Sequence, residues 1–330
     1  MRKTITGFLS LILVTVIAFG LTACFGDSGF YLESTTAKET SATTAYKRSF
    51  FDMTTNPYYS FLSENEKNAY SLIYETLSAG KEKVECKFDL SADELSKAID
   101  SVLNDHPELF WLDNKYAYTY DPSDGSVKEI TFNFYDFAGT PTKLVDAKVK
   151  FEKAADAVLS EARYKPTMVE RELYIHDYIC KNTEYDESAP YNQSAYSALV
   201  LHKSVCAGYA RCFQYLAKKA GITCFYVTGR TEGLKGQVVN GSSEGGSHSW
   251  NIVLLDGSYY NVDCLWDDTA SETYGSMIYP FFNLTDDSFI YHARIEMAKK
   301  LPICTGTKYK YSNYFGQTIE ANNIVFVDAA

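Results

Sequence analysis

Three patterns are missing from this chain of 330 residues, and each absence argues against a class of function. No stretch is dense in Lys and Arg, and 42 acidic residues outnumber 31 basic ones, so no nucleic-acid partner is expected. No Cys-x-x-Cys pair occurs, which argues against a zinc site of the usual spacing. The adjacent acids Asp267 and Asp268 alone do not make a calcium loop, and we interpret them as a solvated turn. We therefore predict no metal and no cofactor.

The composition is that of a globular protein, with 46% hydrophobic and 22% charged residues. The length suffices for one large domain or two ordinary ones. Eight cysteines are present, of which Cys24 and Cys206 are assigned other roles below. In an exported protein the other six can form up to three disulfides or none, and the sequence does not decide between these outcomes. These six are Cys86, Cys180, Cys212, Cys224, Cys264 and Cys304.

The first 23 residues have the pattern of an export signal. Arg2 and Lys3 precede an apolar stretch, which ends in Leu-Thr-Ala before Cys24. This ending resembles the lipobox of bacterial lipoproteins, which implies that Cys24 is acylated and becomes the mature N-terminus. We expect an exported protein, lipid-anchored to the outer face of the bacterial cell membrane. An ordinary signal peptide or a single membrane anchor is the alternative. Residues 24–55, rich in Ser, Thr and Ala, are predicted to form a flexible tether.

Residues 56–140 predict a small N-terminal α+β unit. Capping boxes of the form S-x-x-E begin at Ser63 and Ser91, and each opens an apolar stripe at helical spacing. Residues 116–134 predict a β-hairpin around a Pro-Ser-Asp-Gly turn. His106 stands before a proline at the end of the second helix, where a cap or a turn is a better interpretation than catalysis. We find no catalytic pattern in this unit.

Residues 141–330 are the predicted catalytic domain, which begins with a long helix that has proline at its first position. His176 lies on the next helix with apolar neighbours at helical spacing, so we interpret it as a hydrogen-bonded packing residue. Cys206 stands where a polar loop becomes a helix that ends before Gly221. A thiol in a first helical turn faces unpaired N–H groups and the positive end of the dipole, and both favour the nucleophilic thiolate. Alone, such a cysteine is more often structural.

A hairpin downstream of this helix supplies a base and an acid for the thiol. Residues 247–263 predict two strands joined by an Asp-Gly turn. With a two-residue turn, Trp250 lies opposite Asp263. Because side chains alternate along a strand, His248 lies on the same face as Trp250. His248 and Asp263 are therefore predicted to be diagonal neighbours within hydrogen-bond reach.

Nucleophilic acyl transfer requires the three residue types found at Cys206, His248 and Asp263. The histidine takes the thiol proton, the aspartate fixes the ring tautomer, and a helix-terminal N–H can stabilise the oxyanion. An ordinary hairpin with solvent-facing polar residues is the alternative for each residue alone, but the joint occurrence favours catalysis. His202 is a weaker candidate base, because a loop residue so close to the cysteine in sequence would need a tight fold-back. The sequence indicates no particular partner for His292.

Four segments together resemble the bacterial transglutaminase-like superfamily. They are Ala195-Tyr196-Ser197-Ala198-Leu199, Val205-Cys206-Ala207-Gly208-Tyr209-Ala210, His248-Ser249-Trp250-Asn251 and Tyr260-Asn261-Val262-Asp263-Cys264-Leu265-Trp266-Asp267-Asp268. The resemblance covers roughly residues 165–290 and is specific only as a set. It implies a papain-like α+β fold, the transglutaminase core, in which the nucleophile helix packs on an antiparallel sheet. It also implies that Cys206 is the nucleophile, His248 the base and Asp263 the orienting acid.

The oxyanion donor departs from the papain-like pattern. Such enzymes often have a glutamine six residues before the cysteine, where this chain has Val200. Gln193 or Tyr196 can take the role together with the Cys206 N–H, although packing explains Tyr196 equally well. The Gly- and Ser-rich segment 234–247 directly precedes His248 and is predicted to gate the site.

Two functions follow from these observations. The first is a cell-surface cysteine enzyme that forms a thioester from a peptide or protein amide and then completes cross-linking, deamidation or peptide hydrolysis. Its partners would be a protein or peptide substrate and the membrane that holds the anchor. The second is a catalytically inactive transglutaminase-like scaffold that acts as a surface binding module, which three intact site residues argue against. The sequence leaves open the substrate, the acyl acceptor, the oligomeric state and the role of the N-terminal unit.

Overall fold

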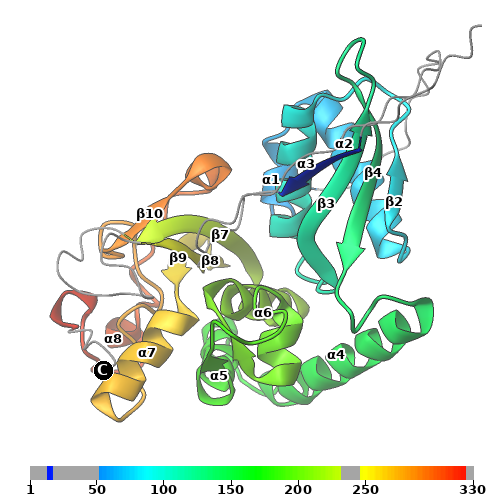
Figure 1. Cartoon of the computed structure of the whole chain (residues 1–330). Coiled ribbons are helices and arrows are strands. Elements are labelled where there is room, and N and C mark those ends of the chain that lie inside the picture. Colours follow the sequence, from blue (N-terminus) through cyan, green and yellow to red (C-terminus); the bar gives the residue numbers. More distant parts are fainter. Residues whose placement is uncertain (1–12, 18–51, 232–245, 325–330) are drawn as a thin grey trace, which may run out of the picture.

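The computed structural model describes residues 13–17, 52–231 and 246–324, which form two units that share one hydrophobic core (Figure 1). The predicted tether, up to residue 51, and most of the predicted gating segment lie outside the described residues. Residues 13–17, within the predicted export signal, form a strand, and the rest of that signal also lies outside them. No helix among the described residues is long and apolar enough to cross a membrane.

The N-terminal unit consists of helices packed beside a four-stranded antiparallel sheet with the strand order β1-β3-β4-β2. Both predicted capping boxes are confirmed. The Ser63 and Ser91 side chains each accept the backbone N–H of the glutamate three residues later, and that glutamate's side chain accepts the backbone N–H of the serine. The predicted hairpin is confirmed as β3 and β4. The elements are β1 (Leu13–Ile17), α1 (Pro57–Ser60), α2 (Glu64–Ser78), β2 (Lys83–Glu85), α3 (Ala92–Asp105), β3 (Leu112–Tyr120) and β4 (Val127–Phe134).

The second unit places helix α6 against an antiparallel sheet with the order β10-β7-β8-β9. The predicted α+β class, with the helix that begins at Cys206 packed on an antiparallel sheet, is therefore confirmed. The main elements are α4 (Pro141–Ala162), α5 (Met168–Asn182), α6 (Cys206–Lys219), β7 (Thr223–Thr231), β8 (Ser247–Leu255), β9 (Ser258–Val262), α7 (Cys264–Tyr274) and β10 (His292–Arg294). Shorter elements connect them: β5 (Glu184–Tyr185), a π-helical turn (Ser197–Leu201), β6 (Lys203–Ser204), 3-10 turns at Glu296–Lys300 and Ala321–Asn323, and α8 (Tyr311–Tyr314).

Helix α6 joins the two units through one polar face. Arg211, Gln214 and Lys218 donate hydrogen bonds of 2.5, 2.9 and 2.8 Å to the carbonyl oxygens of the last three residues of α3. The last carbonyls of a helix have no partner within the helix, so these side chains satisfy them. The N-terminal unit is thereby fixed to the helix that carries Cys206.

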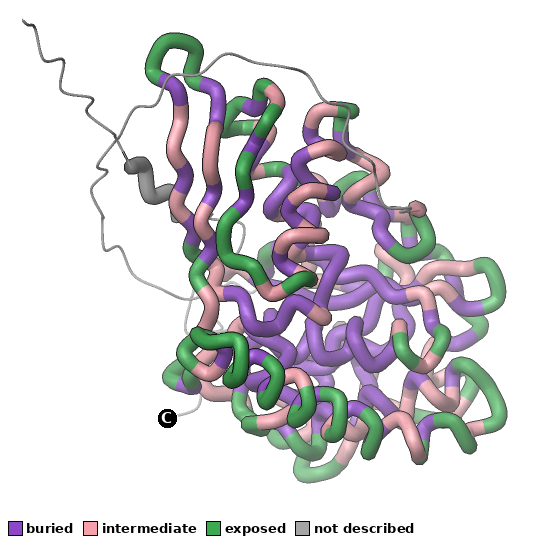
Figure 2. The backbone as a smooth tube through the Cα atoms, turned by 90° about the vertical axis from the view of Figure 1, so that its right-hand side faces the viewer, coloured by how far each residue is buried: buried purple, intermediate pink, exposed green. Residues whose placement is uncertain are grey.

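Helix α6 is also the most enclosed of the described helices. Every residue from 206 to 217 is buried, and Figure 2 shows buried backbone concentrated where the two units meet. The seven described cysteines are all buried free thiols, so no disulfide forms among them. The core that positions the site is therefore held by packing and hydrogen bonds within the described part of the chain.

Candidate active site

Cys206 is the first residue of α6, at a helix start that lacks a side-chain cap. The other described helices of eleven or more residues each have a Ser, Thr or Asp side chain that accepts a first-turn N–H. The N-cap residue of α6 is Val205, which offers no such acceptor. The Gly208 N–H donates to the Val205 carbonyl oxygen over 2.9 Å, which leaves the N–H groups of Cys206 and Ala207 to serve an acceptor outside the helix.

The turn that carries Cys206 is held by the loop before it. The Ser204 hydroxyl donates to the Asn192 carbonyl oxygen over 2.6 Å, and the same oxygen accepts the Val205 N–H. Gly208 lies directly above this contact, where a Cβ atom would be 1.8 Å from the Ser204 oxygen and 2.8 Å from the Asn192 carbonyl oxygen. A side chain at residue 208 would therefore push the first turn of α6 off its support.

The β8–β9 hairpin has the register that the sequence predicts. Asp256 and Gly257 form a two-residue turn with φ angles of 46° and 79°, the left-handed conformation that suits such hairpins. Leu255 pairs with Ser258, and the pairing runs on to residues 251 and 262. The face shared by His248 and Trp250 is thus turned toward residue 263, where β9 has just ended.

His248 and Asp263 are joined by a hydrogen bond of 2.5 Å between Nε2 and Oδ2. Asp263 is the N-cap of α7 rather than the last residue of a strand, and its Oδ1 accepts the Trp266 N–H over 3.1 Å. Helix α7 was not among the predicted elements. Both oxygens of the carboxylate are therefore engaged, which fixes its orientation toward the imidazole of His248.

The electrostatics of His248 are dominated by this carboxylate. Burial alone would lower the pKa of His248, but the charge and hydrogen bond of Asp263, helped by the neighbouring Cys206, raise it to about 10. Conversely, burial would raise the pKa of Asp263, but the charge of His248 holds it well below its usual range. The other ring nitrogen of His248, Nδ1, is buried and has no hydrogen-bond partner among the described residues. The raised pKa favours the protonated ring, and Nδ1 is the nitrogen on which it can exchange a proton with the site.

A second histidine shares the same carboxylate, although the sequence predicted no partner for it. His292 Nε2 lies 3.0 Å from Asp263 Oδ2, and its Nδ1 lies 3.0 Å from the carbonyl oxygen of Ile290. Its side chain is fully buried, and burial lowers its pKa despite the nearby carboxylate. The sequence around His292 gives no local signal for this contact. His292 lies on β10, an edge strand that pairs with β7, and the two strands are far apart in sequence.

The two imidazoles and the carboxylate form a group that can be tested as a metal site. His248, Asp263 and His292 each offer one ligand atom, and these atoms lie within 4.8 Å of one another. Tetrahedral zinc with bonds of about 2.0–2.2 Å separates its ligand atoms by about 3.3 Å. Both nitrogen–oxygen distances, 2.5 and 3.0 Å, are shorter and match hydrogen bonds. The arrangement is that of a hydrogen-bonded trio.

The two candidate oxyanion donors, Tyr196 and Gln193, contact aromatic rings and line a small cavity, respectively. The Tyr196 ring stacks on Phe137 and Phe110 at centroid distances of 4.4 and 5.5 Å, as in the packing interpretation. Gln193 lines a small cavity together with Arg211, and its Oε1 is buried without a hydrogen-bond partner among the described residues. A catalytic role for either stays a prediction. The sequence did not single out Tyr226, which lies close enough to Cys206 to be affected by its charge.

The other histidines lie outside this group. His176 is buried and its Nε2 is 3.0 Å from Asp267 Oδ2, which confirms the packing interpretation. The prediction of a solvated turn at Asp267 and Asp268 is wrong, because both are buried; Asp267 binds His176 and the Phe281 N–H, and Asp268 accepts the Tyr209 hydroxyl.

His106 caps α3 and contacts Glu108. His202 is an exposed residue with a φ angle of 60° after the π-helical turn. Neither of these histidines belongs to the group around Asp263.

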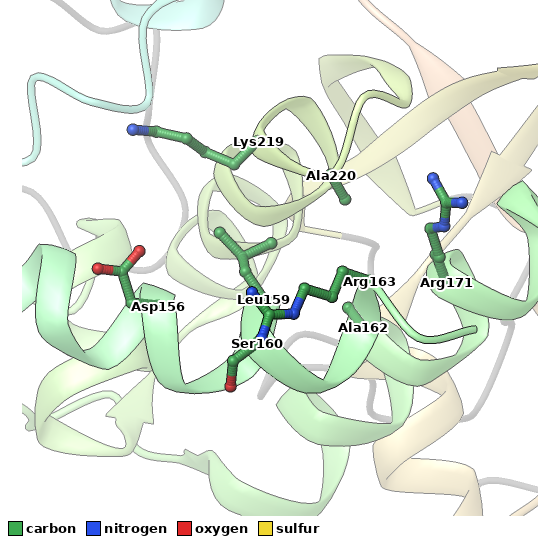
Figure 3. Close-up of a pocket in the computed structure, with 8 residues that line it drawn as sticks. All are labelled: Asp156, Leu159, Ser160, Ala162, Arg163, Arg171, Lys219 and Ala220. Carbon is green, nitrogen blue, oxygen red and sulfur yellow. The ribbon is translucent and has the colours of Figure 1, made fainter.

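Two cavities lie near the ends of these elements. One of about 460 Å³ is at the far end of α6 from Cys206, and Figure 3 shows Arg163, Arg171 and Lys219 around it. Another, of about 280 Å³, is bordered by His292 and Trp250. Cys206, His248 and Asp263 are only 2%, 1% and 1% exposed, so the site itself is closed.

Comparison with known proteins finds relatives for about half of the chain. The chain is 29% identical over 181 residues to the kyphoscoliosis peptidase of Homo sapiens and 26% identical over 179 residues to that of Mus musculus. Each match covers 52% of this chain and 27% of the relative, so the chain spans about a quarter of the length of these relatives. A crystal structure of a TGase aligns with a TM-score of 0.31 at 11% identity, over 55% of this chain and 50% of the other.

The family match coincides with the elements that build the site. Residues 155–264 match the model of the transglutaminase-like superfamily. The matched range contains Cys206, His248 and Asp263 and ends one residue after the last of them. The segment that builds the site, a third of the chain, is therefore similar to the transglutaminase-like superfamily.

Proposed function

We propose that the chain is a cysteine enzyme that cleaves peptide or protein amides through a thioester on Cys206. The observations that carry the proposal are the His248–Asp263 hydrogen bond of 2.5 Å and the closeness of Cys206, which helps to raise the pKa of His248. Cys206 itself begins α6 at a helix start without a side-chain cap. The hydrogen-bonded pair supplies a positioned proton donor and acceptor next to a thiol, the pairing that covalent acyl transfer needs. The alternative, an inactive binding scaffold, gives no reason for this bond or for the missing cap.

The geometry supports the following steps. The Cys206 thiolate attacks the amide carbonyl carbon, and first-turn N–H groups of α6 stabilise the oxyanion. As the carbon–nitrogen bond breaks, His248 Nδ1 gives its proton to the leaving nitrogen, and a thioester remains. Water then attacks the thioester while Nδ1 takes one of its protons, and the carbon–sulfur bond breaks to release the acid and the thiolate. Asp263 keeps the ring oriented throughout.

Water is the acyl acceptor that we favour. The two curated relatives named above are peptidases, and a closed, buried thiol suits a small acceptor better than a lysine side chain. A lysine acceptor would give cross-links and a glutamine substrate would give deamidation. Because Cys206 is only 2% exposed, a peptide reaches the sulfur only when the site opens locally.

The test is to incubate the full chain with a peptide library and to read the products by mass spectrometry. Cleaved peptides from the wild type and none from Cys206→Ala support hydrolysis, whereas cross-linked or deamidated peptides identify the other outcomes. Unchanged peptides in every sample would favour the binding scaffold. Cys304→Ala is a matched control, because it also removes a buried free thiol, far from α6 in sequence.

We further propose that the enzyme works outside the cell membrane, tethered through Cys24. This rests on the basic, apolar and small residues that precede Cys24. Labelling cells with an alkyne fatty acid tests it. Incorporation into the wild type but not into Cys24→Ser supports the anchor, and equal labelling of both contradicts it.

A further inference from the structure

His292 contacts the Asp263 carboxylate, but it has no role in the reaction steps proposed above. Oδ2 of Asp263 lies 2.5 Å from Nε2 of His248 and 3.0 Å from Nε2 of His292. The two rings come from different strands, β8 and β10, which lie on either side of β7. Their centroids are 5.2 Å apart, so the side chains meet across the strand between them.

Gly229 makes this meeting across β7 feasible. It pairs with His248 on one side and with Arg294 of β10 on the other. A Cβ atom here would lie 2.2 Å from the Trp250 ring and 2.6 Å from the Ala293 carbonyl oxygen. A glycine inside a strand commonly marks such a close approach. The space left by the absent side chain is filled by the rings that pack around the carboxylate.

The ring of His292 is held in one orientation. It stacks on Phe289 at a centroid distance of 3.9 Å and meets the edge of Trp250 at 5.1 Å. A carboxylate with a strongly lowered pKa has no proton to donate, so the hydrogen of the shared contact is on Nε2 of His292. Packing and tautomer together aim this N–H at Oδ2.

We propose that His292 is a positioning residue that holds Asp263 in the orientation His248 requires. The proposal deepens the proposed function and rests on it. The Trp266 N–H holds Oδ1 and His292 holds Oδ2, so the carboxylate stays in place when the charge of His248 changes during the reaction. Without His292, His248 is the one imidazole left on Oδ2. The Asp263 carboxylate can then move together with the His248 ring and no longer fixes the orientation of that ring.

Two substitutions separate the hydrogen bond from packing. His292→Phe keeps a ring against Phe289 and removes the donor, whereas His292→Gln restores an N–H donor at a similar reach. His176→Phe is the matched control, because it removes a fully buried histidine that also binds an aspartate at 3.0 Å, outside the site. All three are made in the full chain, and their folded fraction is measured by near-ultraviolet circular dichroism.

The kinetic result expected for His292→Phe is a fall in kcat of about 10- to 100-fold with KM changed less than about twofold, because misalignment of a reacting group acts on the chemical step. His292→Gln recovers most of that loss, and folded His176→Phe keeps the wild-type kcat. Wild-type kcat in folded His292→Phe overturns the proposal. Equal losses in His292→Phe and His292→Gln also overturn it, because they assign the effect to packing.

A spectroscopic measurement separates this inference from the reaction itself. In protein labelled with ¹⁵N-histidine, the short His248–Asp263 bond should give a low-field imidazole proton resonance. We expect this resonance in the wild type and in His292→Gln, and its loss or broadening in His292→Phe. An unchanged resonance in His292→Phe contradicts the positioning role even if the chain proves to cleave no amide. Loss of the resonance without any amide cleavage would sink the proposed function and leave the positioning role standing.

Discussion

Replacing Asp263 by asparagine should return His248 to the behaviour of a buried, uncharged imidazole. Asparagine is as good an N-cap as aspartate, so the start of α7 is preserved. Its single amide oxygen can keep the Trp266 N–H, so an NH2 group takes the place of Oδ2 beside His248, and both the charge and the acceptor for Nε2 are lost there. Burial lowers the pKa of His248 and the charge of Asp263 opposes it. The pKa of His248 in Asp263→Asn should therefore fall from about 10 in the wild type to below the ordinary value.

The size of the effect follows from the same pKa. A rise from the ordinary 6.5 to about 10 corresponds to roughly 5 kcal/mol of preference for the folded state with His248 protonated. For a group whose pKa is raised by folding, this stability is fully present below pH 6.5 and is lost as the pH rises toward 10. The stability advantage of wild type over Asp263→Asn should therefore shrink by about 3 kcal/mol between pH 6.5 and 8.5.

Urea unfolding of both proteins across this pH range measures the advantage, since titrating groups away from Asp263 contribute equally to both and cancel. Imidazole proton resonances followed against pH give the His248 pKa independently. A constant stability difference between pH 6.5 and 8.5 would refute the reasoning. A wild-type His248 that titrates near 6.5 would refute it too.

Three further substitutions test how the site is held. Gly208→Ala should lower the free energy of unfolding by about 1–3 kcal/mol and abolish activity, because its Cβ overlaps the Ser204 hydroxyl below the Cys206 turn. Gly229→Ala should cost a similar ~1–3 kcal/mol by pushing the Trp250 ring away from the β7 strand, and it should also lower kcat. Gln214→Leu should cost about 1–3 kcal/mol, because a buried carbonyl of α3 loses its donor. Urea unfolding measures the stability of all three variants. Gly139→Ala is the control and should change stability little, because its Cβ would meet nothing closer than 3.8 Å. A loss of stability in Gly139→Ala as large as in the other variants would contradict these assignments.

Short sequence patterns predicted the helix starts and the hairpin register described below. Capping boxes at Ser63 and Ser91 mark two helix starts because the side chains that form them are neighbours in sequence. The Asp-Gly turn fixed the β8–β9 register in the same way, and with it the distance from His248 to Asp263. These interactions span a few residues, so the pattern alone specifies them.

The parts that escaped prediction depend on contacts between distant segments. The burial of Asp267 comes from His176, 91 residues away, and a pair of acids in sequence resembles an exposed turn. His292 meets Asp263 only because β10 pairs with β7 and Gly229 leaves room between the strands. The contact of α6 with the end of α3 likewise joins side chains to backbone carbonyls more than 100 residues away, and carbonyls have no sequence signature.

The most direct test of the proposed chemistry is to trap the acyl group on Cys206. Full-length protein is mixed with a peptide that it cleaves, quenched in acid and digested, and the Cys206 peptide is examined by mass spectrometry; a parallel sample receives hydroxylamine before the quench. We predict an added acyl mass on Cys206 in the quenched sample, its release by hydroxylamine as a hydroxamate, and neither product in Cys206→Ala. Cleavage that proceeds in Cys206→Ala, or an acyl group that maps to another residue, would contradict the assignment of Cys206 as the nucleophile.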